Sequence, residues 1–231
     1  MKKSDYTDLF HAGFFLDPRK TALLVIDMQY ATACRATGLG KLLKESGQSE
    51  LGSYRFDRIE KWVIPNISTL LRFFRKNRLK VIYVTIGSQR LDYSDLAVYL
   101  KPLAEAVENR EGLPNHEILH ELKPEEGERV VNKTTMSAFN SSAIDSMLRS
   151  FRITSLILTG VSTNSCVEGT GRDAADRSYF CVMAEDACGA ATPKLHEASL
   201  DNFKRLLGRV EKTSTLIREM EMAIGQPKGP E

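Results

Sequence analysis

The sequence predicts an α/β fold with a doubly wound, mostly parallel six-stranded sheet and helices on both of its faces. Three observations carry this prediction. Short apolar runs of strand length alternate along the chain with longer segments of helical spacing, which is typical of parallel sheets with crossover helices. The first apolar run has no polar alternation, as expected of a strand that is buried on both faces. The chain has 231 residues, of which 42% are apolar, and this length suits one such domain.

Six short segments are the predicted strands. They are residues 21–26, 80–86, 129–131, 155–159, 180–184 and a last short strand that begins at Val210. Four longer segments have apolar residues at helical spacing and are predicted helices. They are residues 57–77, 141–150, 167–178 and 193–207, and one more helix is expected near the C-terminus. In the first of these helices, we expect Trp62, Phe73 and Phe74 to pack against the sheet.

The domain organisation follows from these elements. We expect one domain over residues 19–224, preceded by an N-terminal extension (1–18) and followed by a flexible tail (225–231). Two long insertions, residues 29–56 and 87–128, interrupt the alternation of strands and helices. Both begin at the carboxyl ends of strands, where loops form binding sites, so we expect them to build substrate walls or lids.

Composition excludes several classes of function. Charged residues make up 27% of the chain, but the formal net charge is only +2, which gives no electrostatic footprint for nucleic acid. No apolar stretch of about 18 residues is present to span a membrane, and the N-terminus lacks the apolar core of a signal peptide. The four cysteines have no framework spacing, which favours reduced thiols in the cytoplasm. These features favour a cytoplasmic protein that binds neither nucleic acid nor a membrane.

Polar residues stand at the ends of three predicted strands. Asp27 ends the first strand, Lys133 ends the third, and Cys166 follows the fourth at the start of a predicted helix. The carboxyl ends of parallel strands meet at one edge of the sheet, so these side chains are expected to cluster. A helix N-terminus favours a thiolate, which makes Cys166 the candidate nucleophile, with Asp27 as its base and Lys133 stabilising both anions. Singly, each residue also has a structural interpretation, as a buried thiol, a turn cap or a salt bridge.

Three segments carry a resemblance to a known family. Residues 22–29 read ALLVIDMQ, residues 133–139 read KTTMSAF, and residues 160–168 read GVSTNSCVE. In this order they resemble the opening strand, the lysine motif and the nucleophile motif of the isochorismatase-like cysteine hydrolases. The resemblance covers residues 21–192. Members of that family include N-carbamoylsarcosine amidohydrolase, nicotinamidase, ureidoacrylate and biuret hydrolases, and isochorismatase itself.

The resemblance implies a catalytic triad of Asp27, Lys133 and Cys166. It also implies a cis peptide bond between Val161 and Ser162, and an oxyanion hole formed by the backbone N–H groups of Ser162 and Cys166. The implied activity is hydrolysis of a C–N bond in a small amide, carbamoyl or ureido compound through a thioester intermediate. The family often forms dimers or tetramers, so a homo-oligomer is expected.

Departures from the family pattern narrow the expected chemistry. Isochorismatase itself lacks the nucleophilic cysteine, so Cys166 favours C–N hydrolysis over vinyl-ether cleavage. Metal-binding nicotinamidases carry an Asp-x-His pair after the first strand, but residues 29–56 contain no histidine. We therefore expect no metal and no cofactor. The resemblance implies that Gln29 and Phe139 line the substrate pocket, and Arg90 is expected to hold a substrate carboxylate unless it is simply a solvated loop arginine.

One further motif is set aside. Residues 116–120, HEILH, match the zinc-protease pattern H-E-x-x-H. Pro114 and Pro124 bracket this segment as a helix of two or three turns at most, and no metzincin-type extension follows, so no zinc site is expected. Two other functions stay open on the same fold: an isochorismatase-type or ester hydrolase, and a non-catalytic binding module.

Overall fold

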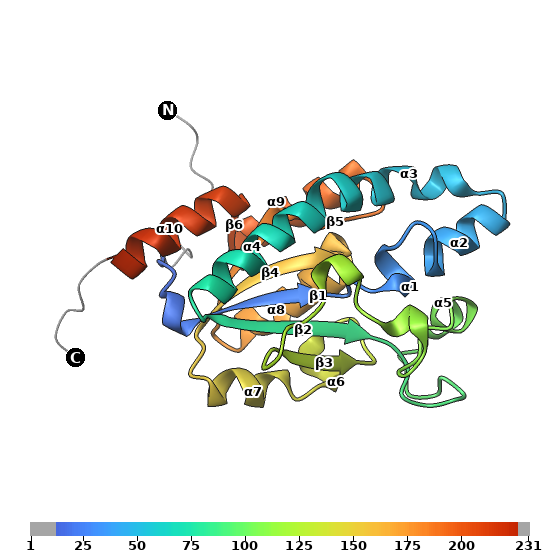
Figure 1. The fold of residues 1–231 in the computed structure, drawn as a ribbon, viewed down its shortest axis with the longest axis horizontal. Coiled ribbons are helices and arrows are strands. Elements are labelled where there is room, and N and C mark those ends of the chain that lie inside the picture. The colour runs from blue at the N-terminus through green and yellow to red at the C-terminus, as the bar shows by residue number, and fades with distance from the viewer. Residues whose placement is uncertain (1–12, 226–231) are drawn as a thin grey trace.

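The sheet is six-stranded and parallel throughout in the computed structural model, which describes residues 13–225 (Figure 1). Its strands are β1 Thr21–Ile26, β2 Lys80–Ile86, β3 Arg129–Lys133, β4 Ser155–Val161, β5 Phe180–Gly189 and β6 Gly208–Glu211. They lie in the order β3-β2-β1-β4-β5-β6, so the chain starts in the middle and winds outward in both directions. The predicted doubly wound α/β fold is confirmed.

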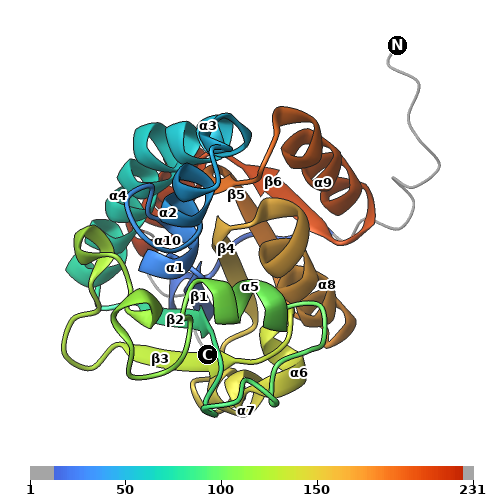
Figure 2. The same ribbon diagram turned by 90° about the vertical axis from the view of Figure 1, so that its right-hand side faces the viewer.

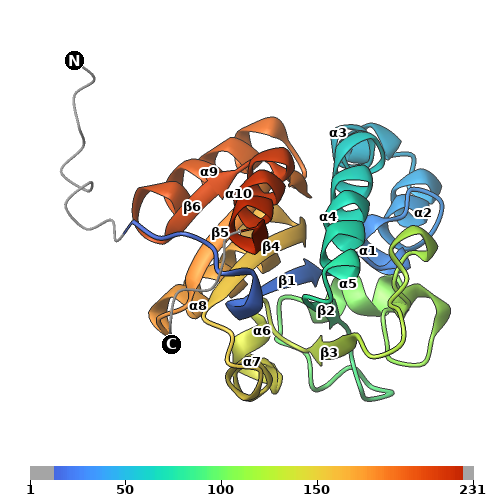
Figure 3. The same ribbon diagram turned by 60° about the vertical axis from the view of Figure 1, so that its left-hand side comes forward.

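Helices cover both faces of the sheet (Figures 1 and 3). They are α1 Tyr30–Ala33, α2 Gly38–Glu45, α3 Ser49–Arg58, α4 Ile64–Lys76, α5 Lys101–Ala106, α6 Ala138–Ser141, α7 Ile144–Ser150, α8 Glu168–Asp176, α9 Pro193–Leu206 and α10 Thr213–Gly225. Side chains of β1 point alternately to two cores. Leu23 and Val25 belong to the core under α4 and α10, and Leu24 and Ile26 to the core under α7, α8 and α9.

The helical run before β2 starts earlier than predicted. It consists of α3, a π-helical segment (Ile59–Val63) and α4, and it therefore begins at Ser49 rather than at residue 57. The buried stripe of this run continues backwards from Ile59 through Phe56 to Gly52, at the three- and four-residue steps of a helix face. The small and polar residues between these positions gave the segment the composition of a loop.

One aromatic residue of this run is not where it was predicted. Phe73 and Phe74 are buried against the sheet as expected, but Trp62 is 57% exposed. The prediction that Trp62 packs a helix onto the sheet was therefore wrong. Its neighbours Ile59 and Val63 occupy the buried face of the π-helical turn instead.

Both insertions fold over the carboxyl ends of the strands. Figure 2 looks at this edge of the sheet, with α1, α2 and α5 nearest the viewer. Residues 29–56 form α1, α2 and most of α3, and residues 87–128 contain α5 and two 3-10 turns, Pro114–His116 and His120–Leu122. Of the predicted N-terminal extension (1–18), residues 13–18 are described, and of the predicted tail (225–231) only residue 225 is described. Within residues 13–225, no helix is long and apolar enough to cross a bilayer.

Gly160 allows β4 to approach β1 at the point where the site begins. Its φ is +111°, and a Cβ built there would lie 2.0 Å from the Ile26 carbonyl oxygen, so any side chain would force the two central strands apart. We expect Gly160→Ala to lower the free energy of unfolding by about 3 kcal/mol or more. Gly127→Ala is the control, because Gly127 has φ +88° but open space around it. If chemical denaturation showed equal losses in the free energy of unfolding for both variants, the close approach of β4 to β1 would not explain the effect at Gly160.

Candidate active site

The three predicted catalytic side chains meet at one point of the sheet edge. Lys133 Nζ lies 2.9 Å from Asp27 Oδ2 and 3.3 Å from Cys166 Sγ. Asp27 directly follows β1 and Lys133 ends β3, and β2 lies between these strands. A long side chain is therefore needed to reach across the end of β2, which a lysine provides. All three residues are buried, with exposures of 2%, 0% and 7% for Asp27, Lys133 and Cys166.

Burial and mutual charge set the protonation states of this cluster. Burial raises the pKa of the Asp27 carboxyl, and the Lys133 ammonium opposes this only in part. Burial works against a charged Lys133, but Asp27 and Cys166 outweigh it, so the pKa of Lys133 is raised. Burial and then the Asp27 carboxylate raise the pKa of Cys166 to about 12. Cys166 is therefore a thiol at neutral pH, not the thiolate that a helix N-terminus would favour.

A neutral thiol needs a base before it can attack a carbonyl carbon. Asp27 Oδ1 is buried and has no hydrogen-bond partner among residues 13–225, while Oδ2 accepts from Lys133. An unpaired buried carboxylate oxygen beside a thiol is suited to receive its proton. The arrangement can thus transfer a proton from Cys166 to Asp27 with Lys133 stabilising the resulting thiolate.

The turn that carries Cys166 differs from the predicted first turn of an α-helix. Residues Thr163–Val167 are π-helical, and α8 begins only at Glu168. The peptide bond between Val161 and Ser162 is cis. The Ser162 carbonyl oxygen accepts hydrogen bonds from the N–H groups of Ser165 and Val167, which closes the turn around Cys166.

A polar network supports this turn from behind. His196 Nδ1 lies 2.8 Å from Thr163 Oγ1. Ser199 Oγ donates to Glu168 at 2.6 Å and also lies 3.1 Å from the Thr163 carbonyl oxygen. Burial and then the nearby Arg58 lower the pKa of His196 to about 4, so its ring is neutral. Sequence reasoning missed these residues of α9, because a single histidine or serine in a helix gives no motif.

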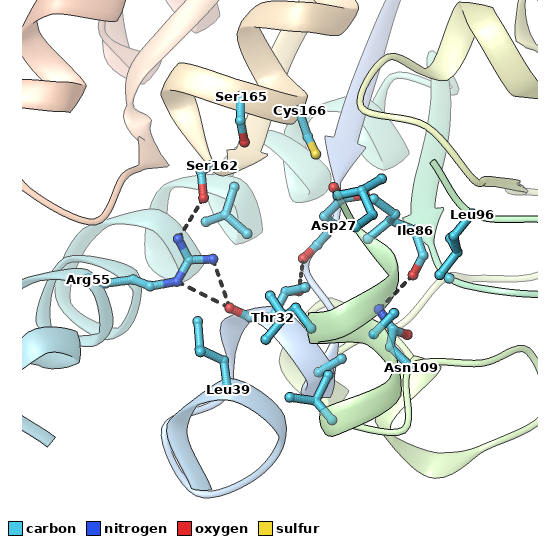
Figure 4. A pocket seen from close by; sticks show the side chains of 17 residues that line it. Asp27, Thr32, Leu39, Arg55, Ile86, Leu96, Asn109, Ser162, Ser165 and Cys166 are labelled. Atoms are coloured by element: carbon cyan, nitrogen blue, oxygen red, sulfur yellow. Dashed lines mark hydrogen bonds between the residues drawn. The ribbon is translucent and has the colours of Figure 1, made fainter. Parts of the chain in front are cut away.

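A cavity of about 180 Å³ lies in front of Cys166 (Figure 4). Both insertions contribute to its apolar wall, which includes Leu39, Leu96, Leu100, Leu103, Ala104 and Val107. Its polar lining consists of Asp27, Thr32, Arg55, Asn109, Ser162, Ser165 and Cys166. The site is thus a small apolar chamber with a few placed polar groups, the usual form of a small-molecule site.

Arg55 is the charged residue of the polar lining that the sequence did not reveal. It extends from α3 into the cavity, where Nη1 donates to Ser162 Oγ at 2.6 Å and Nη2 donates to the Thr32 carbonyl at 2.9 Å (Figure 4). The residue is only 8% exposed. Its signal was the buried stripe Gly52–Phe56–Ile59, which places Arg55 on the inner face of the helix once α3 is recognised.

The three predicted substrate contacts lie outside this lining. Gln29 is fully buried, and its side-chain amide bonds to the backbone of Ile86 and His116. Arg90 lies on an exposed loop beside Asp92, at 3.4 Å. Phe139 packs into the core under α7 and α8. None of the three is among the described residues that line the cavity.

The H-E-x-x-H segment does not form a helix. His116 ends one 3-10 turn, His120 starts another, and Ile118 between them pairs with Gln29 as an antiparallel bridge. His116 Nε2 lies 3.0 Å from Asn132 Oδ1. Among the described residues, no group of three or more His, Cys, Asp or Glu side chains is placed to hold a metal ion.

The sequence is similar to those of known proteins. The sequence model of the Isochorismatase domain family matches residues 21–215. The chain is 30% identical over 221 residues to ureidoacrylate amidohydrolase RutB of Acinetobacter baylyi, and the match covers 89% of this chain and 86% of that protein.

Solved structures share the fold. A cysteine hydrolase from Pseudomonas syringae superposes with a TM-score of 0.76 at 25% identity, covering 91% of this chain and 97% of that one. N-carbamoylsarcosine amidase from Thermoplasma acidophilum superposes with a TM-score of 0.62 at 23% identity, covering 84% of this chain and 96% of that one. The second likeness concerns the fold alone.

Proposed function

The chain belongs to the isochorismatase family of hydrolases, and on this premise we propose that it is a cysteine-dependent amidohydrolase. It cleaves a C–N bond of a small amide, carbamoyl or ureido compound through a thioester-type intermediate. Ureidoacrylate, which the Acinetobacter relative is named for, is the first candidate substrate. The observation that carries the proposal is the contact of Lys133 Nζ with both Asp27 and Cys166.

The proposed mechanism follows from the protonation states. Asp27 takes the thiol proton as Cys166 Sγ attacks the carbonyl carbon, and Lys133 stabilises the thiolate and the carboxylate. The N–H groups of Ser162 and Cys166 bind the oxygen anion of the tetrahedral intermediate. Its collapse breaks the C–N bond, and Asp27 returns the proton to the leaving amine. Asp27 then activates a water molecule, which hydrolyses the acylated Cys166 and regenerates the thiol.

The proposal is tested by ammonia release from a panel of amides, carbamoyl compounds and ureido compounds that includes ureidoacrylate. Wild type is assayed with a chelator present. Chelator-resistant release from at least one compound is the expected result. If none of these compounds released ammonia, the result would count against C–N hydrolysis.

The acidic limb of the pH profile should report Asp27. As the base, Asp27 must be ionised, and burial raises its pKa above the ordinary value of 3.8. A raised carboxyl pKa keeps the acid form to higher pH, so kcat/KM should fall with acid at a higher pH than an exposed aspartate would allow. A kcat/KM profile that stayed flat down to pH values near 4, with the protein still folded, would argue against Asp27 as the base.

A further inference from the structure

The cavity holds a second buried cation whose charge is unbalanced. Lys133 is paired with Asp27 at 2.9 Å, but Arg55 has no salt bridge to any described acidic residue. Burial lowers the pKa of Arg55 to about 10, which still leaves it charged at neutral pH. Arg35, an exposed neighbour on the same side of the molecule, has carboxylates of Asp57 and Glu60 within 2.8 Å. The Asp27 carboxylate also attracts Arg55, but it is already paired with Lys133, so two buried cations share one carboxylate. This excess of buried positive charge is costly, which indicates a role in binding an anion.

Two N–H groups of the Arg55 guanidinium have no hydrogen-bond partner among the described residues. A guanidinium has five N–H groups, and three of them are used. Nε and Nη2 donate to the Thr32 carbonyl, and Nη1 donates to Ser162 Oγ. One N–H on each terminal nitrogen remains without a partner among residues 13–225, which is the number that a carboxylate takes in a two-point contact. The bonds to Thr32 and Ser162 also hold the side chain in one position, so that it is preorganised.

An anion bound at Arg55 would lie close to Cys166. Ser162 and Cys166 belong to the same turn, so a group bound at Arg55 lies in the same chamber as the nucleophile (Figure 4). Leu39 and the residues around α5 give the space between them apolar walls. A fitting ligand has a carbonyl carbon for Cys166, a short carbon body, and an anionic end.

We propose that Arg55 binds the carboxylate of the substrate and makes the enzyme selective for amide or ureido acids over their uncharged analogues. The inference rests on the proposed function, and ureidoacrylate has this chemistry, with a ureido group at one end and a carboxylate at the other. Arg55 takes the part that the sequence suggested for Arg90, which lies on an exposed loop.

A different role for Arg55 would act through Ser162. Its bond to Ser162 Oγ would then position the backbone of the nucleophile turn, and no carboxylate would be involved. The two roles differ in one measurable respect. A carboxylate receptor discriminates between a charged ligand and its neutral ester, whereas a positioning residue affects both ligands equally.

The test measures binding, so that it does not depend on turnover. Titration calorimetry is performed on Cys166→Ala protein with ureidoacrylate and with its methyl ester, which keeps the ureido group but not the charge. Adding Arg55→Met should weaken binding of the acid by about 10- to 100-fold and change binding of the ester little. Arg55→Lys should recover part of the loss, because it keeps the charge but not the fork. Arg35→Met is the matched control and should leave both affinities unchanged.

The ester also serves as the folding control within the Arg55→Met protein. Equal weakening for acid and ester, or no binding of the acid while Arg55 is present, would overturn the inference. Failure of the proposed function looks different, since wild type would then release no ammonia from ureidoacrylate even though its acid group bound in an Arg55-dependent way.

Discussion

Cys166→Ala should lower kcat/KM for the hydrolysed substrate by about 10⁴-fold or more, because it removes the thiol that Lys133 contacts and that forms the covalent intermediate in the proposed mechanism. Substrate binding should largely survive, since the cavity wall and Arg55 are untouched. The measurement is steady-state kinetics on the compound that the panel identifies. If Cys166→Ala turned over the substrate at a rate near that of wild type, Cys166 could not be the nucleophile.

Cys181→Ala is the matched control for this variant. Cys181 is also a buried free thiol, and burial alone raises its pKa to about 12, the same value as for Cys166. Its Sγ donates a hydrogen bond to the Tyr179 carbonyl and not to a residue of the Asp27–Lys133–Cys166 cluster. The control should therefore keep its activity. A comparable loss in both variants would point to a structural effect of removing buried thiols.

Lys133→Met should destabilise the fold as well as abolish activity. The change leaves the buried Asp27 carboxylate without its ionic partner, and breaking a buried pair in this way costs about 3–5 kcal/mol. The loss should be greatest at neutral to alkaline pH. Because the pKa of Asp27 is raised in the folded protein, folded Asp27 binds more protons than unfolded Asp27 at pH values between the two pKa values. The free energy of unfolding therefore falls as the pH rises through this interval.

A double variant separates the charge from the packing. Asp27→Asn together with Lys133→Met removes both charges, so it should recover much of the stability lost in Lys133→Met while staying inactive. Denaturant unfolding at two pH values measures both effects. Lys133→Met as stable as wild type, or a double variant no more stable than Lys133→Met, would show that the pair carries no buried charge.

The clustering of Asp27, Lys133 and Cys166 could be predicted because polar residues at strand ends give a clear signal. Asp27 follows an unbroken apolar run, Lys133 ends β3, and Cys166 lies in the turn that follows β4. The parallel topology then brings the three residues together regardless of how the loops fold, because the carboxyl ends of all strands lie at one edge of the sheet. The family resemblance and the residue pattern agreed on these three positions.

The cavity wall was harder to predict, because it depends on how two long insertions fold. Arg55 lies in a segment whose glycine and serines hid a helix, and only the buried stripe through Phe56 gives the side that it faces. The family resemblance implied that Gln29 lines the pocket, but its amide satisfies backbone groups of Ile86 and His116 instead. Such tertiary partners lie 57 and 87 residues away and leave no local pattern.

The central claim is that Cys166 is acylated during hydrolysis of a C–N bond, and mass analysis of the acid-quenched enzyme during turnover tests it most directly. The account predicts an adduct with the mass of the acyl or carbamoyl group on the peptide that contains Cys166, formed only while substrate remains. Cys166→Ala should form no adduct and no product. Sustained turnover with the Cys166 peptide unmodified at every time point, together with an active Cys166→Ala variant, would contradict the account.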